Sequence, residues 1–268
     1  MSDSPRSVPD WVLALIDRAR EADGAPPFSD QSLVDYRTGL RELVTIDEDA
    51  AALATEVDTE FVVDPGKRGH GIGTRMLETL LLRSNGMRFW THGDHPAARA
   101  LAKKYGFKAR RELLHFVGEA PELTRLSPGA GVFRVGHDED EWVALNTRTF
   151  AHHPEQGSVT KADLEELETE PWFRADNFLV LRRDGRMIGY CWLKVEGDRG
   201  EFYVVGVSPD HQGEHLGSQL FDAGLARLAE LGVRKAHLYV EADNEPALRL
   251  YRARAFTQDS IDIQYATR

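Results

Sequence analysis

Two short glycine-bearing loops contain the residue types that can hold a phosphate group. The first loop, Arg68–Gly73 (Arg-Gly-His-Gly-Ile-Gly), lies between an apolar, strand-like segment and an amphipathic, helix-like segment. Glycines let a backbone approach a ligand closely, and the N-terminus of the following helix adds partial positive charge. Lys67, His70 and Arg75 add further positive charge. The loop therefore predicts a site for a diphosphate.

The second loop, Gln212–Gly217, lies about half a chain length further on. A dinucleotide-binding loop of the Rossmann type needs the spacing G-x-G-x-x-G after a first strand and an acidic residue about 20 positions later. Neither loop has that spacing, which excludes the Rossmann reading. Two matching loops in one chain make a plain glycine turn a poor explanation for either.

The elements that must position these loops repeat in the same order, which indicates a duplicated domain. Each loop follows an apolar strand that ends in Asp-Pro or Ser-Pro. Each precedes a helix, a short strand, a second helix and a closing strand. In the first half these four segments span 74–82, 88–92, 97–107 and 111–117, and in the second half 218–231, 236–240, 246–256 and 261–266. We predict a first domain over 1–120, a linker over 121–130 and a second domain over 131–268.

The two halves differ upstream of their loops. The second half contains a predicted strand at 132–135, helical segments between 140 and 169, and a hairpin of strands at 178–181 and 187–195. The first half begins directly with predicted helices over 9–21 and 29–39. We therefore expect the first domain to lack its initial strand.

Composition narrows the class of protein. The 268 residues are 41% hydrophobic and 29% charged, as in an ordinary globular protein of two domains. The net charge of −11 argues against non-specific nucleic-acid binding. No apolar run is long enough to span a membrane, the N-terminus is polar, and the single cysteine, Cys191, fits a reducing compartment. We expect a cytoplasmic protein without nucleic-acid or membrane partners, for which a monomer is compatible with the sequence.

The pattern Q/R-x-x-G-x-G/A between a strand and a helix resembles the acyl-CoA loop of the GCN5-related N-acetyltransferases (GNATs). That family has an α/β fold of the α+β type, with a mixed, mostly antiparallel sheet, helices on both faces, and two strands that splay apart to admit the pantetheine arm. Other segments resemble the mycothiol synthases, tandem GNAT proteins that acetylate the cysteinyl amine of Cys-GlcN-Ins. These segments are 23–26, 150–157, 192–195, 200–207 and 238–244.

The resemblance implies acetyl-CoA as co-substrate, with no metal. It implies contacts to acetyl-CoA from Phe61, Val62, Val63, Arg68, Gly69, His70, Gly71, Ile72, Gly73 and Thr74, and from Val205, Gly206, Val207, Gln212, Gly213, Glu214, His215, Leu216, Gly217, Ser218, Asn244 and Arg249. One position departs from the family: His215 replaces the first required glycine, and Gly213 stands two places early. The pairs His211/His215 and His152/His153 lack the accompanying residues of a metal motif.

Acetyl transfer needs a base for the amine, donors for the oxyanion and an acid for the thiolate. Glu201 begins the strand that leads into the second loop, so it can face the amine, and the backbone N–H groups of 205–207 can polarise the thioester. Tyr251 stands at the family's usual position for the acid. Taken singly, Glu201 could be a solvated strand end and Tyr251 a packing aromatic. Their placement around one loop favours catalysis.

The first half should bind acetyl-CoA without using it. Val57 and Ala102 stand opposite Glu201 and Tyr251 when the two halves are aligned, so neither catalytic group is present. On resemblance, the amine substrate is bound by Glu155, Lys194, Tyr239 and Glu201, and by Asp30 from the first half. Two other functions stay open: an N-acetyltransferase for another small amine or a peptide N-terminus, and a non-catalytic acyl-CoA-binding protein.

Overall fold

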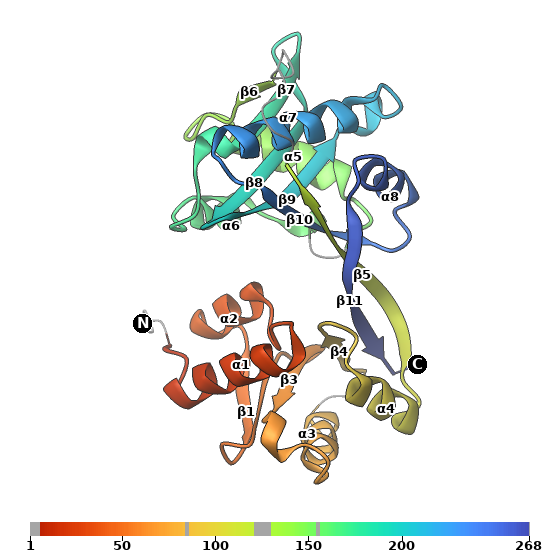
Figure 1. The fold of residues 1–268 in the computed structure, drawn as a ribbon. Coiled ribbons are helices and arrows are strands. Elements are labelled where there is room, and N and C mark those ends of the chain that lie inside the picture. Colours follow the sequence, from red (N-terminus) through yellow and green to blue (C-terminus); the bar gives the residue numbers. More distant parts are fainter. Residues whose placement is uncertain (1–5, 84–85, 121–129, 154–155, 268) are drawn as a thin grey trace. The chain divides into compact units, whose positions relative to one another are not determined.

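The computed structural model describes residues 6–83, 86–120, 130–153 and 156–267. Contacts divide the chain into two units (Figure 1). Unit 1 holds residues 1–114, 241–243 and 260–268, and unit 2 holds 115–240 and 244–259.

Unit 1 follows the element order expected for its half. Its elements are α1 (Asp10–Asp23), α2 (Asp30–Arg37), β1 (Glu42–Ile46), β2 (Ala50–Ala54), β3 (Asp58–Val63), α3 (Ile72–Leu81), β4 (Arg88–Thr91), α4 (Pro96–Tyr105) and the first part of β5 (Lys108–Glu119). Within the described residues of this half, α1 is the first element, in agreement with the expected missing strand.

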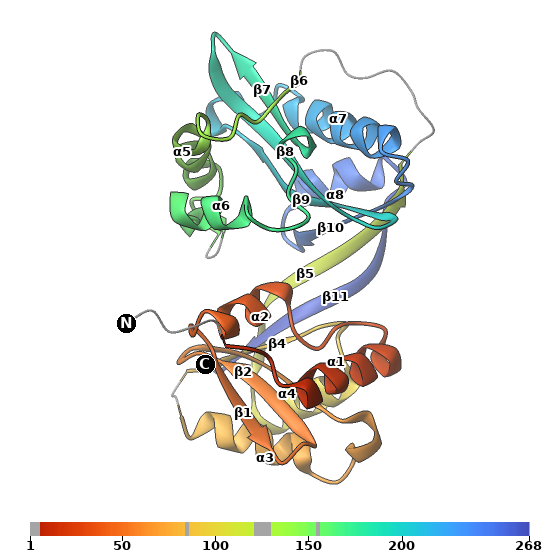
Figure 2. The same ribbon diagram turned by 90° about the vertical axis from the view of Figure 1, so that its left-hand side faces the viewer.

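The sheet of unit 1 is covered on both faces because β2 presents small and apolar residues to each side. Ala51 and Leu53 pack with α1 and Phe28, whereas Ala50, Ala52 and Ala54 pack with α3. Alanine side chains let helices approach a sheet closely, so this strand is buried along its whole length. Figure 2 shows α1 and α3 on either side of the strands.

Unit 2 contains the fuller set of elements that the sequence predicts. They are β6 (Ala130–Val132), α5 (Glu139–Thr149), α6 (Lys161–Leu167), β7 (Phe178–Arg183), β8 (Arg186–Glu196), β9 (Arg199–Val207), α7 (Leu216–Glu230), β10 (Lys235–Glu241), α8 (Glu245–Arg252) and the first part of β11 (Thr257–Ala266). The turn between β7 and β8 uses Asp184 and Gly185, both with positive φ, as a two-residue hairpin requires. Trp142, Phe178 and Trp192 pack together in the core under α5.

The closing strand of each half passes into the other unit. β5 contributes residues from His115 onward to unit 2, and β11 contributes its residues from Ser260 to Ala266 to unit 1. There β11 pairs antiparallel with β4, with Ile263 opposite Thr91 and Tyr265 opposite Phe89. The predicted boundary kept all of 131–268 together, so the contacts assign this last strand differently. Of the predicted linker, residues 121–129 lie outside the described residues, and Ala130 begins β6.

These observations confirm the expected fold class. Both units have a mixed sheet with helices on its two faces, and in each a parallel strand pair stands beside antiparallel neighbours.

Candidate functional site

In each unit the parallel strand pair stays together only over a short stretch. β9 pairs with β10 from Arg199 opposite Lys235 to Glu201 opposite His237, and both strands then continue, to Val207 and Glu241. β3 pairs with β4 from Asp58 opposite Arg88 to Glu60 opposite Trp90. We call the last paired position the fork. Glu201 and Glu60 therefore each stand at the fork of their unit.

A pocket of about 440 Å³ lies in unit 1 between the two strands and the first loop. Most of the residues predicted to contact acetyl-CoA in this half line it. They are Phe61, Val62, Val63, Arg68, Gly69, Gly71, Ile72, Gly73 and Thr74. The opposite wall includes Trp90, Thr91, His92, Leu101 and Ala102.

The first loop presents bare backbone to this pocket. Gly69 and Gly71 have φ values of +81° and +80°, a left-handed conformation that glycine adopts without strain. A Cβ added to either would meet no atom within 4 Å, so the backbone borders open space. Gly71 is also the N-cap of α3, whose first N–H groups lack intrahelical partners. This geometry suits a phosphate.

Arg68 braces the loop rather than extending into the pocket mouth as a free cation. Its guanidinium donates two hydrogen bonds, of 2.6 and 2.7 Å, to the carboxylate of Asp23 at the end of α1, and its Nε donates to the carbonyl of Val63. Hydrogen bonding to Arg68 lowers the pKa of Asp23. The predicted contact of Arg68 with a phosphate is therefore in competition with this ion pair.

The second loop differs at the residue that caps its helix. His215 occupies the N-cap of α7 with φ 61° and ψ 15°, the place and conformation that Gly71 has in unit 1. A side chain in this conformation stores strain on the order of 1 kcal/mol. Beside it, Glu214 accepts from Arg183 at 2.8 Å and contacts His211 at 3.0 Å, and these contacts lower its pKa to about 2.

Unit 2 brings Glu201 into a row of polar side chains on one face of the sheet. Lys194 on β8 lies opposite Glu201 in the β8–β9 register, and His237 on β10 lies beside it at the fork. Register partners project to the same face. His237 continues the row, because its Nδ1 lies 3.3 Å from Nε2 of His115. Burial, His115, Arg199 and Lys194 lower the pKa of His237 to about 4.

Tyr251, the predicted acid, lies on the face of the unit 2 sheet opposite to Glu201. It lies on α8 and packs against Phe221 of α7, with ring centroids 5.1 Å apart, and against Phe116. Burial raises the pKa of Tyr251, so its hydroxyl stays protonated at neutral pH. The backbone confirms the predicted alignment with Ala102: Phe256 N donates to the carbonyl of Tyr251, as Phe107 N donates to that of Ala102.

The fork of unit 1 corrects one expectation. Val57, which aligns with Glu201 when the loops are superimposed, is exposed and precedes β3, whereas Glu60 stands at the fork. The offset fails because β9 continues further beyond its fork than β3 does, and its pairing with β8 contains a register shift. Unit 1 therefore does contain a carboxylate in the corresponding place.

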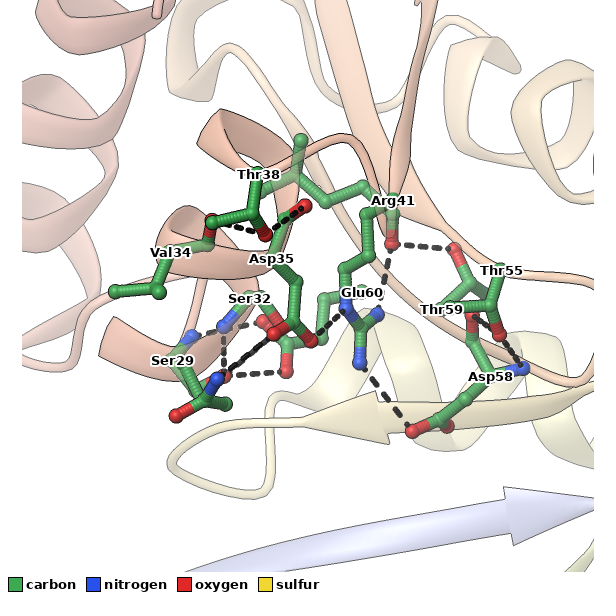
Figure 3. A network of polar contacts seen from close by, with 12 residues as sticks. Ser29, Ser32, Val34, Asp35, Thr38, Arg41, Thr55, Asp58, Thr59 and Glu60 are labelled. Atoms are coloured by element: carbon green, nitrogen blue, oxygen red, sulfur yellow. Dashed lines mark hydrogen bonds and ion pairs between the residues drawn. The ribbon is translucent and has the colours of Figure 1, made fainter. Parts of the chain in front are cut away.

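Glu60 is part of the network of polar contacts drawn in Figure 3. It is only 2% exposed. Its two oxygens accept hydrogen bonds from the N–H of Ser29, at 2.7 Å, and from the hydroxyl of Ser29, at 2.9 Å. Ser29 is in turn the N-cap of α2. Burial alone would raise the pKa of Glu60, but His92, Ser29 and Arg41 lower it.

Of the residues predicted to bind the amine substrate, Lys194 and Glu201 share the polar row of unit 2. Asp30 is the first residue of α2 in unit 1, and Glu155 lies outside the described residues. Lys194 lies over the ring of Trp172, 5.4 Å from its centroid, and pairs with Glu196. Tyr239 stacks on His115 with a centroid distance of 4.7 Å.

Two predicted contacts of acetyl-CoA in unit 2 have local partners. The Asn244 side chain caps α8 by accepting from the N–H of Ala247, and Arg249 is exposed and pairs with Glu245 at 3.8 Å. Within the described ranges, no three His, Cys, Asp or Glu side chains are grouped so that they could hold a metal ion. No helix in the same part of the chain is long and apolar enough to cross a membrane.

Comparison with known proteins agrees with this geometry. Residues 142–256 match the acetyltransferase (GNAT) family, and residues 38–109 match an acetyltransferase (GNAT) domain. Two solved structures share the fold over nearly the whole chain. A GCN5-related N-acetyltransferase from Sphaerobacter thermophilus has a TM-score of 0.73 at 18% identity, covering 97% of this chain and 96% of its own. A tandem GNAT protein from the clavulanic acid biosynthesis pathway has a TM-score of 0.70 at 16% identity, covering 98% and 97%.

Curated relatives are much more similar in sequence. The mycothiol acetyltransferase of Clavibacter michiganensis subsp. michiganensis is 43% identical over 277 residues, covering 95% of this chain and 90% of its own. That of Streptomyces griseus subsp. griseus is 40% identical over 279 residues, covering 96% and 91%. The chain is therefore an acetyltransferase with two GNAT domains, and it belongs to the family of the mycothiol acetyltransferases.

Proposed function

We propose that this enzyme transfers the acetyl group of acetyl-CoA to the cysteinyl amine of Cys-GlcN-Ins, giving mycothiol and free CoA, and that unit 2 carries the reaction. The observation that carries the proposal is that unit 2 combines a carboxylate at its fork with a tyrosine on a helix of the opposite face. Glu201 stands at the fork on one face of the sheet, and Tyr251 approaches from helices on the other. Relatives named for this activity support the choice of substrate.

The chemistry follows from that placement. Glu201 takes a proton from the substrate ammonium, and the freed amine attacks the thioester carbonyl. Backbone N–H groups in the separated part of β9, from Val205 to Val207, hold the oxyanion. When the carbon–sulfur bond breaks, the Tyr251 hydroxyl gives its proton to the thiolate. A tyrosine that stays protonated at neutral pH suits that role. The nitrogen, which must lose a second proton to become the amide, returns a proton to the tyrosine through solvent, and Glu201 releases the first proton to solvent.

Unit 1 binds acetyl-CoA without reacting it. Its pocket and glycine loop support binding. Two features argue against chemistry: Ala102 replaces the acid, and the Glu60 carboxylate is buried and held by Ser29. A carboxylate that an amine cannot reach cannot act as its base.

The remaining assignments belong to the same proposal. Lys194, Tyr239, Glu155 and Asp30 bind the sugar–cyclitol part of the substrate or its cysteinyl group. The protein acts in the cytoplasm on a small molecule, and a monomer suffices for the reaction because each chain carries both proposed catalytic groups.

Release of free CoA tests the function. Chromatographic measurement of free CoA should show turnover with acetyl-CoA and Cys-GlcN-Ins, whereas GlcN-Ins, which lacks the cysteinyl amine, should give none. Equal or faster release with unrelated amines would instead favour a GNAT enzyme with another substrate. Stoichiometric binding of acetyl-CoA without release in any of these mixtures would favour a non-catalytic acyl-CoA-binding protein.

A further inference from the structure

His92 of unit 1 is a pocket residue whose surroundings the proposed function leaves unexplained. It directly follows β4 and lines the pocket. His92 lies two residues beyond Trp90, the last paired position of β4, and Val62 lies two residues beyond Glu60, the last paired position of β3. Both residues line the pocket.

Two buried carboxylates hold the imidazole. Nδ1 of His92 lies 2.7 Å from Oδ2 of Asp262, whose other oxygen accepts from the N–H of Gly93 at 3.0 Å. Nε2 lies 3.7 Å from Oε2 of Glu60. Burial alone would lower the pKa of His92, but Asp262 and Glu60 outweigh it and raise the pKa to about 10. At neutral pH both ring nitrogens therefore carry protons.

One of those protons has no acceptor. Nε2 is buried and makes no hydrogen bond, because the 3.7 Å separation from Glu60 is an ion-pair contact beyond hydrogen-bonding distance. A buried, charged donor that makes an ion-pair contact but no hydrogen bond is incompletely satisfied, and this costs free energy. An acceptor supplied by a ligand in the pocket would satisfy it.

The chemistry of acyl-CoA offers such an acceptor. The diphosphate suits the glycine loop, and the apolar side chains of Phe61, Val62 and Trp90 suit the methylene arm. The thioester carbonyl is a hydrogen-bond acceptor, whereas the thiol of free CoA is a weak one. We propose that His92 donates Nε2–H to the thioester carbonyl and thereby makes the pocket of unit 1 select acyl-CoA over free CoA.

This inference rests on the proposed binding of acetyl-CoA in unit 1. Its consequence is that the first site would stay filled with the co-substrate even as the reaction releases CoA. A hydrogen bond from a charged donor favours acetyl-CoA on the order of 10- to 100-fold over CoA at this site.

The test measures three ligands at the pocket of unit 1: acetyl-CoA, CoA and S-ethyl-CoA. S-ethyl-CoA matches the size of the acetyl thioester but has no carbonyl. Calorimetric titration of the intact protein, compared with the Gly71→Leu variant that blocks the mouth of this pocket, isolates the first site. We expect acetyl-CoA to bind at least tenfold more tightly than both other ligands.

The outcomes separate the inference from the function on which it rests. Equal affinity for acetyl-CoA and S-ethyl-CoA would overturn the role of the carbonyl while leaving acyl-CoA binding in place. If Gly71→Leu changes the binding of none of the three ligands, the proposed function of unit 1 is overturned instead.

A variant assigns the effect to His92. His92→Gln should bring the affinity of acetyl-CoA down to that of S-ethyl-CoA, whereas His95→Gln, a second histidine of the same pocket, should preserve the ratio. Because His92→Gln leaves two buried carboxylates without their partner and can fail to fold, the wild-type protein provides a further measurement. The Nε2–H proton resonance of His92 should shift with acetyl-CoA and not with S-ethyl-CoA. The same shift with both ligands contradicts the proposal.

Discussion

The forks of the two units carry the same functional group in opposite settings. Glu60 and Glu201 each occupy the last paired position of a parallel strand pair. Glu60 is buried and held by Ser29, whereas Glu201 lies in a partly exposed polar row with Lys194 and His237 as register neighbours. The proposed division of roles implies that a carboxylate at the fork is not sufficient for catalysis, and that access to this carboxylate and an acid on the opposite helix are needed as well.

The largest effect on turnover should come from replacing the partly exposed carboxylate of Glu201. Glu201→Gln should lower turnover about 10²–10⁴-fold while acetyl-CoA binding is retained, because an amide cannot take the ammonium proton. Steady-state CoA release and a binding titration check both parts. Near wild-type turnover at neutral pH would remove Glu201 from the role of base. As the matched control, Glu60→Gln should leave the transfer step in unit 2 unchanged in any protein that folds.

Loss of the acid should have the next largest effect. Tyr251→Phe removes one hydroxyl from a packed ring and should lower the rate on the order of 10²-fold without unfolding the protein. Because burial raises the pKa of Tyr251, the hydroxyl stays protonated throughout the accessible pH range, so its loss should lower the rate at every pH. A rate identical to that of the wild type would show that Tyr251 packs against Phe221 and does not act as the acid. Phe221→Leu, which disturbs the packing alone, serves as the comparison.

The buried cluster of unit 1 should make stability depend on pH. The folded-state pKa of His92, about 10, lies above its ordinary value of 6.5. Its contribution to stability is therefore fully present below pH 6.5 and is lost as the pH rises through 10. Urea unfolding of the wild type and of His92→Gln should give free energies that differ most near pH 6 and converge toward pH 10.5. A difference that stays constant with pH would show that the imidazole is not charged in the folded protein.

The smallest effect concerns the two loops. His215→Gly should relieve the left-handed strain at the N-cap of α7 and stabilise the protein by about 1 kcal/mol. It should also lower the KM for acetyl-CoA with little change in kcat, because the loop binds the co-substrate and does not take part in the chemical step. Thermal unfolding and steady-state kinetics measure the two effects. A raised KM would mean that the His215 side chain itself contacts a phosphate.

Much of this comparison was predictable from sequence because it depends on local signals. Glycines at 69 and 71, the order of strands and helices, and Ala102 opposite Tyr251 all follow from patterns that do not need the tertiary fold. The fork of unit 1 was not predictable, because strand registers and the extra length of β9 move the corresponding residue from Val57 to Glu60.

Contacts between residues that lie far apart in the sequence were also not predictable. Asp262 comes from the last strand and reaches His92 because β11 pairs with β4. His115 and His237 meet through neighbouring strands from different halves of the sequence. In each case the pairing of a closing strand brings the groups together, and no spacing along the chain predicts that pairing.

A pulse–chase experiment tests most directly whether chemistry is confined to unit 2. The enzyme is loaded with radiolabelled acetyl-CoA at both sites and mixed rapidly with Cys-GlcN-Ins and a large excess of unlabelled acetyl-CoA. We predict that one labelled acetyl group per chain appears in the product in the first turnover, and that the second stays bound or exchanges unreacted. Glu201→Gln should transfer none. Transfer of two labelled groups per chain, or transfer by Glu201→Gln, would contradict the division of roles between the units.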